Sequence, residues 1–521
     1  MGNDKNMEKY PSVAQDTDIE NGIVTASDTL SEKQHHVNQY ANDLSDVQAS
    51  QGWFGSLVRY TRYLRIEERG IERVREEDRY NQSVLTGFTM WASANFTPST
   101  FATGLLGPVF GLGFWDSFAI IVIINFTFSW IISWFGLLGP QTGLRAMSIS
   151  RFSFGIWGLR VLVILNLCGA IGWSSVNAIA GAQVLNELSD GNCPLWAGNL
   201  IIGVCTGVIC FFGYYVVHTF EKYCWIAQLF SFIFVAGYGA KHFDASALPM
   251  GSGGKEASGA MSFIASIYGF VIGWASAAPD YNVRMPVNTN RTKLVLATWA
   301  GNFFGTTIPE VLGAAFMTAV AKDQAFADAY DNRGVGGLMG QALKPLGGFG
   351  KFLLVLLTLS IVGCNLISNY SLAFMCQNFH PALIKVPRFV WTILGTAAVI
   401  AISIAAANTF IDVMESFLSV IGYYGTPFVV VLVCEHYIFR GGQYPLDDWN
   451  NMDVMPYGIA GVFAIGMGFV GAVLSMNQTW YVGVVSRAIH PPAELGWIFS
   501  GAFSGIGFVP VRWLERRFTG R

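Results

Sequence analysis

The sequence predicts an all-α polytopic membrane protein with twelve transmembrane helices, and two observations predict this fold class. First, hydrophobic residues make up 52% of the 521 residues and charged residues only 12%, about half the ~25% found in soluble domains. Second, from about residue 84 the chain becomes a series of apolar runs, each near the ~20 residues that cross a ~30 Å hydrocarbon layer. The net charge of −3 provides no basic field for nucleic acid, which disfavours a nucleic-acid-binding function.

Polar segments flank one twelve-helix membrane domain, which is predicted over residues 81–511. Residues 1–52 are polar and lack the apolar core of a secretory signal, so they are predicted to form a disordered cytoplasmic tail. Residues 53–80 combine many Arg and Glu residues with apolar residues at helical spacing, which predicts an amphipathic juxtamembrane segment; a solvated charged linker helix is the alternative. Residues 512–521 are predicted to form a short basic cytoplasmic tail.

The predicted membrane spans are separated by short polar breaks or breaks that contain Gly and Pro. The expected ranges are 84–110, 115–138, 159–187, 198–217, 223–241, 260–280, 295–321, 350–377, 388–407, 410–434, 456–476 and 490–511. Lys and Arg gather in the short loops on one side, whereas the opposite loops GLGFWD, NELSDGNCPLWAG and ANTFID contain neither. The positive-inside rule therefore predicts that both termini are cytoplasmic.

Two of the spans are interrupted by residues that break helices. The first contains Ser93, Asn95 and Pro98 near its middle, and the sixth contains Gly273 and Ser276. In lipid, irregular backbone survives only where it is buried in protein or lines a cavity. Breaks in corresponding positions five helices apart indicate an inverted-repeat transporter, in which the substrate binds at mid-membrane between the two halves. The alternative is that the glycines only allow close helix packing.

The third span carries a pair of residues suited to a planar ligand. Trp173 and Asn177 lie four residues apart and hence on one helix face. An indole offers a flat apolar face to a heterocycle, and an amide supplies donors and an acceptor to its edge. Trp274, within the sixth-span break, is expected to form the opposite wall. A tryptophan at the lipid interface beside a packing asparagine is the alternative interpretation.

Polar residues inside two further spans also need partners. The eighth span carries Asn365 and Asn369 in an apolar helix, where an amide requires either a neighbouring helix or a ligand. Glu310 is the deepest carboxyl group, since Asp116 and Asp412 lie at the beginnings of their spans. An intramembrane carboxyl group must be paired or neutral, which makes Glu310 the candidate for proton coupling.

Motifs of catalysis and of metal binding are missing from the sequence. No GxSxG, HExxH, Walker or CxxC pattern occurs, and the histidines of the membrane domain are scattered near the ends of spans. The sequence therefore predicts neither an enzyme nor a metal site. The run Asn477-Gln478-Thr479 matches an N-glycosylation pattern, although patterns of three residues are common by chance.

Several longer motifs occur along the chain in an order that is specific to one family. They include MWASANFTPSTFATGLLGPVFGLGFWDS, LCGAIGWSSVNAIAGAQVLNEL, FFGYYVVHTFEKY, GWASAAPDYNVRMPVNTN and SFLSVIGYYGTPF. Over residues 50–521 the chain resembles the fungal purine-cytosine permeases of the nucleobase-cation-symport-1 family. The resemblance implies a sodium-leucine-transporter-like fold, with a 5+5 inverted repeat and with broken helices 1 and 6.

The resemblance also implies which residues bind the substrate. The family pattern matches residues on the first, third, sixth and eighth helices: Ser93, Asn95, Trp173, Asn177, Trp274 and Asn365. The eighth-helix signature of the family reads approximately Asn-Asn-x-Pro-Asn-x-Tyr, whereas this chain has Ile367-Ser368 at the Pro-Asn position. A hydroxyl in place of an amide changes which edge atoms of a ring can be hydrogen-bonded, so Ser368 bears on substrate choice.

The function implied by the resemblance is secondary active transport by alternating access. The expected substrates are purine bases or cytosine, imported across the plasma membrane by proton symport, with no cofactor and with sodium as the alternative coupling ion. Because of Ile367-Ser368, another small nitrogen heterocycle, such as a form of vitamin B6 or a specialised metabolite, is an alternative substrate. A nutrient sensor that does not transport is a further alternative, for which residues 1–80 would supply the signalling tail. The expected partners are the heterocycle and the lipid bilayer, not nucleic acid.

Overall fold

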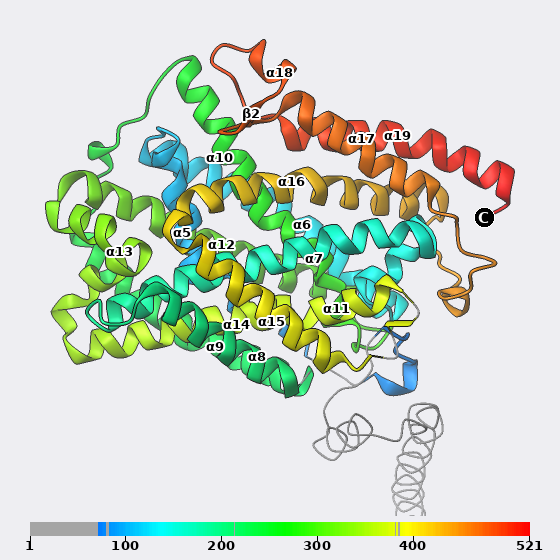
Figure 1. The fold of residues 1–521 in the computed structure, drawn as a ribbon, viewed down its shortest axis with the longest axis horizontal. Helices are drawn as coiled ribbons and strands as arrows, with labels where there is room; N and C mark the ends of the chain where they lie inside the picture. The colour runs from blue at the N-terminus through cyan, green and yellow to red at the C-terminus, as the bar shows by residue number, and fades with distance from the viewer. Residues whose placement is uncertain (1–70, 80–82, 213, 381, 384–385) are drawn as a thin grey trace, which may run out of the picture. The chain divides into compact units, whose positions relative to one another are not determined.

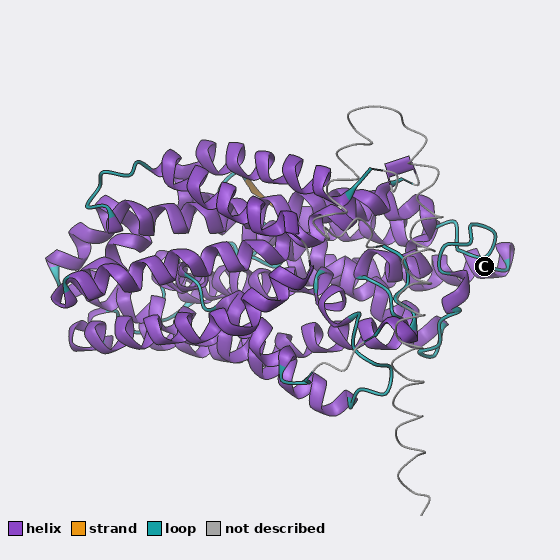
Figure 2. Ribbon diagram, turned by 90° about the horizontal axis from the view of Figure 1, so that it is seen from below, coloured by secondary structure: helices purple, strands orange, loops and turns teal. Residues whose placement is uncertain are grey.

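The computed structural model describes residues 71–79, 83–212, 214–380, 382–383 and 386–521. These residues form a bundle of mostly long helices, and the strands among them make one small antiparallel sheet (Figures 1 and 2). The predicted tail over residues 1–52 and most of the predicted amphipathic segment over residues 53–80 lie outside the described residues.

Except for α13, which lies between two of the expected spans, the long helices overlap the expected apolar ranges along the chain. They are α4 (Thr86–Asn95), α5 (Pro98–Val109), α6 (Phe114–Thr142), α7 (Ala146–Leu188), α8 (Leu195–Phe212), α9 (Tyr214–Gly239), α10 (Gly254–Ile272), α12 (Arg291–Lys322), α13 (Gln324–Leu343), α14 (Gly348–Phe379), α15 (Arg388–Ala406), α16 (Phe410–Cys434), α17 (Ile459–Ser475) and α19 (Gly496–Thr519).

Short elements join these helices. They are the 3-10 turns η1 (Glu76–Asp78), η2 (Ala240–His242), η3 (Ala245–Ala247), η4 (Gly273–Ser276), η5 (Lys344–Leu346), η7 (Ala407–Thr409) and η9 (Leu446–Asp448), the π-helical turn η8 (Glu435–Phe439), the short helices α11 (Ala278–Asn282) and α18 (Val484–Arg487), and the strands β1 (Asn477–Gln478) and β2 (Tyr481–Val482). In the sheet, Asn477 pairs with Val482 and Gln478 with Tyr481.

Seven helical stretches within the described residues are long and apolar enough to cross a membrane. They are Phe114–Thr142, Ala146–Leu188, Lys222–His242, Gly254–Ser276, Arg291–Lys322, Gly348–Phe379 and Arg388–Phe439, and two shorter apolar helices cover Leu195–Phe211 and Ile459–Ser475. Large apolar side chains such as Ile123, Ile164 and Ile233 are exposed on these helices. Apolar surface of this extent is what lipid, rather than water, would cover.

The first expected break is present between α4 and α5. The helix ends at Asn95, and Thr97 begins the next one with extended backbone, its side chain accepting a hydrogen bond from Thr100 N at 3.3 Å. Pro98 occupies the first helical position, where its missing N–H has no intrahelical partner to lose. The local sequence therefore stops one helix and starts another within two residues.

The second expected break lies between α10 and α11. The regular helix ends at Ile272, the chain tightens into η4, and Pro279 lies in the first turn of α11. Both breaks face the interior of the bundle, because Asn95, Trp274 and Ala275 are buried. The two irregular segments therefore offer backbone and side chains to the inside of the protein, where a polar site can form.

Close packing of α5 on α12 depends on a glycine. A side-chain Cβ at Gly104 would overlap the carbonyl oxygen of Glu310, so the two helix backbones approach more closely than any other residue would permit. This contact fixes the position of the Glu310 backbone beside the second half of the broken first helix.

The C-terminal helix differs from the expected short basic tail. α19 continues to Thr519, and Arg512 is buried, 1% exposed, rather than free in solvent. Its guanidinium donates from Nε and from Nη2 to the two oxygens of Glu435, each at 2.9 Å. Glu515 accepts from the N–H groups of Gly458 and Ile459 at the beginning of α17. Ion pairing keeps this part of the chain helical and joins α19 to η8 and α17.

Candidate substrate site

Asn95, the last residue of α4, connects three elements at the first break. Its Nδ2 donates to Trp91 O at 2.9 Å and to Asn302 Oδ1 at 3.2 Å, and its Oδ1 accepts from Trp274 Nε1 at 3.0 Å. The side chain is fully buried. Each of these hydrogen bonds replaces water that the residue cannot reach, so the amide fixes η4 against α4 and α12.

The two expected indole walls lie at the sixth-helix break. Trp274 packs edge-on against Trp91, with ring centroids 5.5 Å apart. Trp173 of α7 packs edge-on against Phe270 of α10 and Phe417 of α16, at 5.1 and 5.3 Å. Aromatic neighbours in this geometry hold a ring in one orientation. Both indoles are therefore held in place before any ligand arrives.

A small cavity lies between these walls. Its volume is about 20 Å³, which is the space of one water molecule rather than of a heterocycle. The lining comes from α7, η4, α14 and α16 and includes Trp173, Trp274, Ser276, Ser368 and Tyr424. A ring can enter only if α7 and η4 separate.

Asn177 and Asn365 lie outside this cavity lining and contact one another instead. Asn177 Nδ2 donates to Asn365 Oδ1 at 3.0 Å and to Cys364 Sγ at 3.3 Å, while Asn365 Nδ2 donates to Ser174 O at 3.0 Å. In this conformation the two amides join α7 to α14. These hydrogen bonds support the alternative interpretation of Asn365, in which its amide joins neighbouring helices.

Ser93 and Ser368 occupy different surroundings. Ser368 lines the cavity, 9% exposed. Ser93 is fully buried, and within the described part of the chain its Oγ has no hydrogen-bond partner. The predicted residues therefore divide into three that line the cavity (Trp173, Trp274 and Ser368) and four that do not (Ser93, Asn95, Asn177 and Asn365).

Glu310 is fully buried in α12 and faces α6. Asn125 Nδ2 donates to Glu310 Oε2 at 2.5 Å, and Oε1 has no hydrogen-bond partner among the described residues. One turn along α6, Ser129 Oγ accepts from Asn302 Nδ2 at 2.8 Å. Asn125 and Ser129 are one turn apart on α6, and Glu310 and Asn302 are about two turns apart on α12. A row of polar side chains therefore runs from Glu310 to Asn302, which is hydrogen-bonded to Asn95.

The contacts of Arg145 were not predicted from the sequence. There, the Lys and Arg residues of the short loops served only to predict the orientation of the chain in the membrane. Arg145 donates from Nη1 to Asp280 O and from Nη2 to the Tyr370 hydroxyl, both at 3.2 Å. Its guanidinium lies 3.7 Å from the ring centroid of Phe374. Asp280 Oδ1 accepts from Ala146 N at 2.8 Å. These contacts join α11 to the beginning of α7 and to α14, and only the three-dimensional fold reveals them.

Tyr424 and Ser276 are further lining residues that were not predicted. A signal existed for each of them. Ser276 ends the glycine-containing break, and Tyr424 belongs to the motif SFLSVIGYYGTPF on α16. Neither residue type is distinctive without the fold, because tyrosines and serines occur throughout the spans.

Comparison with known proteins shows which family this chain belongs to. Residues 73–483 match the family model described as a permease for cytosine/purines, uracil, thiamine and allantoin. The chain belongs to this permease family. The predicted resemblance is thereby confirmed, the chain is a multi-pass membrane protein, and its class is permease rather than enzyme.

Relatives match along nearly the whole permease. A purine-cytosine permease of Emericella nidulans is 37% identical over 473 residues, which cover 90% of this chain and 92% of the relative. A purine-cytosine permease of Saccharomyces cerevisiae is 34% identical over 507 residues, covering 96% and 94%. A vitamin B6 transporter of Saccharomyces cerevisiae is 27% identical and covers 88% of each chain.

The solved structures show the same fold. A nucleobase-cation-symport-1 family transporter, in a closed conformation with bromovinylhydantoin bound, superposes with a TM-score of 0.65 at 14% identity, covering 87% of this chain and 96% of that chain. At such low identity the likeness establishes the arrangement of helices and says nothing of the ligand.

Proposed function

We propose that this permease is a secondary active transporter that imports purine bases or cytosine across the plasma membrane. The observation that carries the proposal is the pair of held indoles, Trp173 and Trp274, which face one cavity at the sixth-helix break. Two aromatic walls bind a planar ring through its faces, and neighbouring polar groups then select its edge. The names of the relatives support a nucleobase as that ring.

The proposed architecture is a twelve-span, 5+5 inverted repeat with both termini in the cytoplasm. Support comes from the breaks at Phe96-Thr97 and at η4, which lie where an inverted repeat would place them. Transport then proceeds by alternating access: the cavity of about 20 Å³ must widen to admit a base and must open to one side at a time.

Proton symport is proposed to use Glu310. Its carboxyl group is one of the few acidic groups buried in the bundle, and the polar side chains of α6 and α12 lead from it toward Asn95 and so to Trp274. A proton on Glu310 would change the hydrogen bond with Asn125 and thereby the packing of α6 on α12. The proposed path from Glu310 thus ends at the hydrogen bond from Trp274 to Asn95, which holds one wall of the cavity.

A vitamin B6-like heterocycle is the second candidate substrate, because of Ile367-Ser368 and the similarity to a vitamin B6 transporter. Ser368 lines the cavity, so the residue that departs from the usual Pro-Asn is one that can contact substrate. A hydroxyl donates and accepts through a single oxygen, whereas an amide presents two donors and an acceptor on separate atoms side by side. Substrates that need a paired donor and acceptor at this edge should be bound less well.

Competition for uptake tests the proposal. The chain is expressed in a host without nucleobase or vitamin B6 transport, and uptake of radiolabelled adenine is measured with unlabelled cytosine, guanine, hypoxanthine, uracil and pyridoxine in excess. Competition by purines and cytosine but not by pyridoxine supports the nucleobase assignment. Uptake of labelled pyridoxine with no uptake of any base would replace it with the second candidate.

A further inference from the structure

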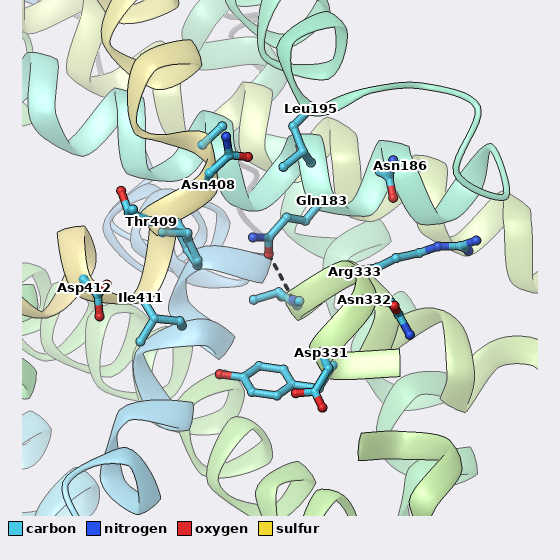
Figure 3. Close-up of a pocket in the computed structure, with 15 residues that line it drawn as sticks. Gln183, Asn186, Leu195, Asp331, Asn332, Arg333, Asn408, Thr409, Ile411 and Asp412 are labelled. Atoms are coloured by element: carbon cyan, nitrogen blue, oxygen red, sulfur yellow. Dashed lines mark hydrogen bonds between the residues drawn. The ribbon is translucent and has the colours of Figure 1, made fainter. Parts of the chain in front are cut away.

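A cavity much larger than the central one lies beside α13, at the end of the bundle opposite the C-terminus (Figures 1 and 3). Its volume is about 510 Å³, within the ~300–1,000 Å³ range of small-molecule sites. Figure 3 shows that the lining comes from the end of α7, the beginning of α8, the middle of α13 and the turn that leads into α16. In the proposed orientation this cavity opens outward.

Gln183 supplies a free donor to this cavity. Its Oε1 accepts a hydrogen bond from Val335 N at 3.0 Å, which leaves Nε2 with no partner among the described residues. The side chain is 8% exposed, and Figure 3 shows the amide nitrogen turned toward the segment that carries Thr409. Because this unpartnered nitrogen is still accessible, it can donate a hydrogen bond to a ligand or to water in the cavity.

Carboxylates add hydrogen-bond acceptors to the lining. Asp331 and Asp412 bring them from exposed positions, and Asn408 brings an amide, which both donates and accepts. The lining cation, Arg333, extends away from Gln183 in Figure 3, and its Nη1 donates to Glu187 Oε2 at 2.7 Å. The charge that remains around Gln183 is therefore negative, which favours ligands with N–H donors and disfavours anions.

Tyr330 adds an aromatic ring to the lining. Burial and the neighbouring Asp331 carboxylate raise the pKa of Tyr330 above its usual value, so the phenol keeps its proton at every working pH. A ring face, one amide donor and two carboxylate acceptors together match a neutral planar heterocycle that carries amino or ring N–H groups.

We infer that this cavity is an outer binding site for an amino-substituted nucleobase, in which Gln183 Nε2 donates to a ring acceptor and Asp331 and Asp412 accept from N–H groups. The inference rests on the proposed function. Gln183 follows Trp173, which lines the central cavity, by ten residues on α7, which is about 15 Å along a helix. A base held at Gln183 thus waits almost three turns outside the closed central cavity and enters when α7 and η4 separate.

The decisive substitution is Gln183→Glu. A glutamate oxygen still accepts from Val335 N–H, so the contact with α13 survives, while the donor to the ligand is lost and a negative charge is added. The matched control is Gln341→Glu on α13, which adds the same charge at a glutamine that does not line this cavity. Asp412→Asn, at an exposed position, is the second test variant and leaves folding least disturbed.

The binding test uses the purified full-length chain in lipid nanodiscs and radiolabelled adenine in equilibrium dialysis. Two classes of site are expected in the wild type. Trp274→Ala should weaken one class, and adding Gln183→Glu or Asp412→Asn to it should weaken the remaining class at least tenfold, whereas adding Gln341→Glu should not. In uptake, Gln183→Glu should raise KM severalfold and leave the maximal rate unchanged.

Three outcomes would overturn the outer site. A wild type that takes up adenine but binds a single equivalent, all of it lost in Trp274→Ala, would remove the outer site and leave the proposed function intact. Equal effects of Gln183→Glu and Gln341→Glu would do the same. A wild type that neither binds nor takes up any base would overturn both the proposed function and the outer site.

Discussion

Single amides decide how the central site is assembled. Asn95 uses its oxygen for Trp274 and its nitrogen for Trp91 and Asn302, so one side chain sets the position of an indole wall. Asn177 and Asn365 use theirs to join α7 to α14. In the fold described here, these amides join the elements that surround the central cavity.

Trp274→Phe tests the hydrogen bond at this wall. The ring face is retained, but Asn95 Oδ1 loses its donor while buried, which costs about 1–3 kcal/mol. We expect KM for uptake to rise roughly 5- to 100-fold. The control is Trp115→Phe, because Trp115 is 54% exposed on α6 and far along the helix from the site. Equal behaviour of the two variants would remove Trp274 from the site.

Glu310→Gln tests proton coupling. A glutamine oxygen can still accept from Asn125 Nδ2, so packing is preserved while the group that could carry a proton is lost. Wild-type uptake is expected to be faster at pH 5 than at pH 7.5, because protons enter with the base, and the variant should lose that ratio. Initial rates at the two pH values measure it. A variant that keeps the wild-type ratio would place the coupling group elsewhere.

At the level of residues, the sequence was informative where one side chain is chemically distinctive. Trp173, Trp274 and Glu310 were singled out because an indole at a helix break or a carboxyl group in an apolar span is rare. The pairing of Asn177 with Asn365 could not be foreseen, since it depends on how α7 rotates against α14. Arg145 was missed for the same reason: its partners come from α11 and α14.

At the level of elements, the helix breaks were predictable because their causes are local. Thr97 and Pro98 cap and start α5, and Gly273 begins η4. The kink in α13 was not predicted. Gly334 has a φ of 56° there, and a Cβ on it would lie 2.6 Å from Gln183 Oε1. A kink of this kind depends on the contact with α7, which the local sequence does not reveal.

Gly334→Ala should destabilise the protein by about 1–3 kcal/mol, since both the left-handed backbone and the contact with Gln183 oppose a side chain. Gly347→Ala is the matched control: its φ is 55°, but a Cβ there meets nothing within 4 Å. Thermal unfolding of the two purified variants separates backbone strain from contact. Identical melting temperatures would show that the contact between α13 and α7 contributes nothing.

At the level of the whole molecule, the contacts of α11 with α7 and α14 close the bundle beside the central cavity. Asp280 and Arg145 make this closure, and Tyr281 adds a hydrogen bond from its hydroxyl to Ile367 O at 2.9 Å. Alternating access requires such contacts to break and re-form in each cycle. The family could be predicted from motifs in the sequence, but the closing contacts emerged only from the assembled helices.

Asp280→Ala should reduce uptake at least tenfold, because the buried Ala146 N–H loses its acceptor and Arg145 loses the neighbouring negative charge. Asp280→Asn keeps an oxygen for Ala146 N–H and should fall between the wild type and Asp280→Ala. Uptake rates normalised to the amount of protein at the cell surface measure the series. An alanine variant as active as the asparagine variant would contradict a closing role for this hydrogen bond.

The central claim is that the chain carries a nucleobase through the site between Trp173 and Trp274. The most direct measurement is the initial rate of radiolabelled adenine and cytosine uptake by the wild type and by Trp274→Ala, in a host without nucleobase transport. The account predicts saturable wild-type uptake of at least one of these bases and a marked loss in the variant. Wild-type uptake of neither base, or full uptake in Trp274→Ala, would contradict it.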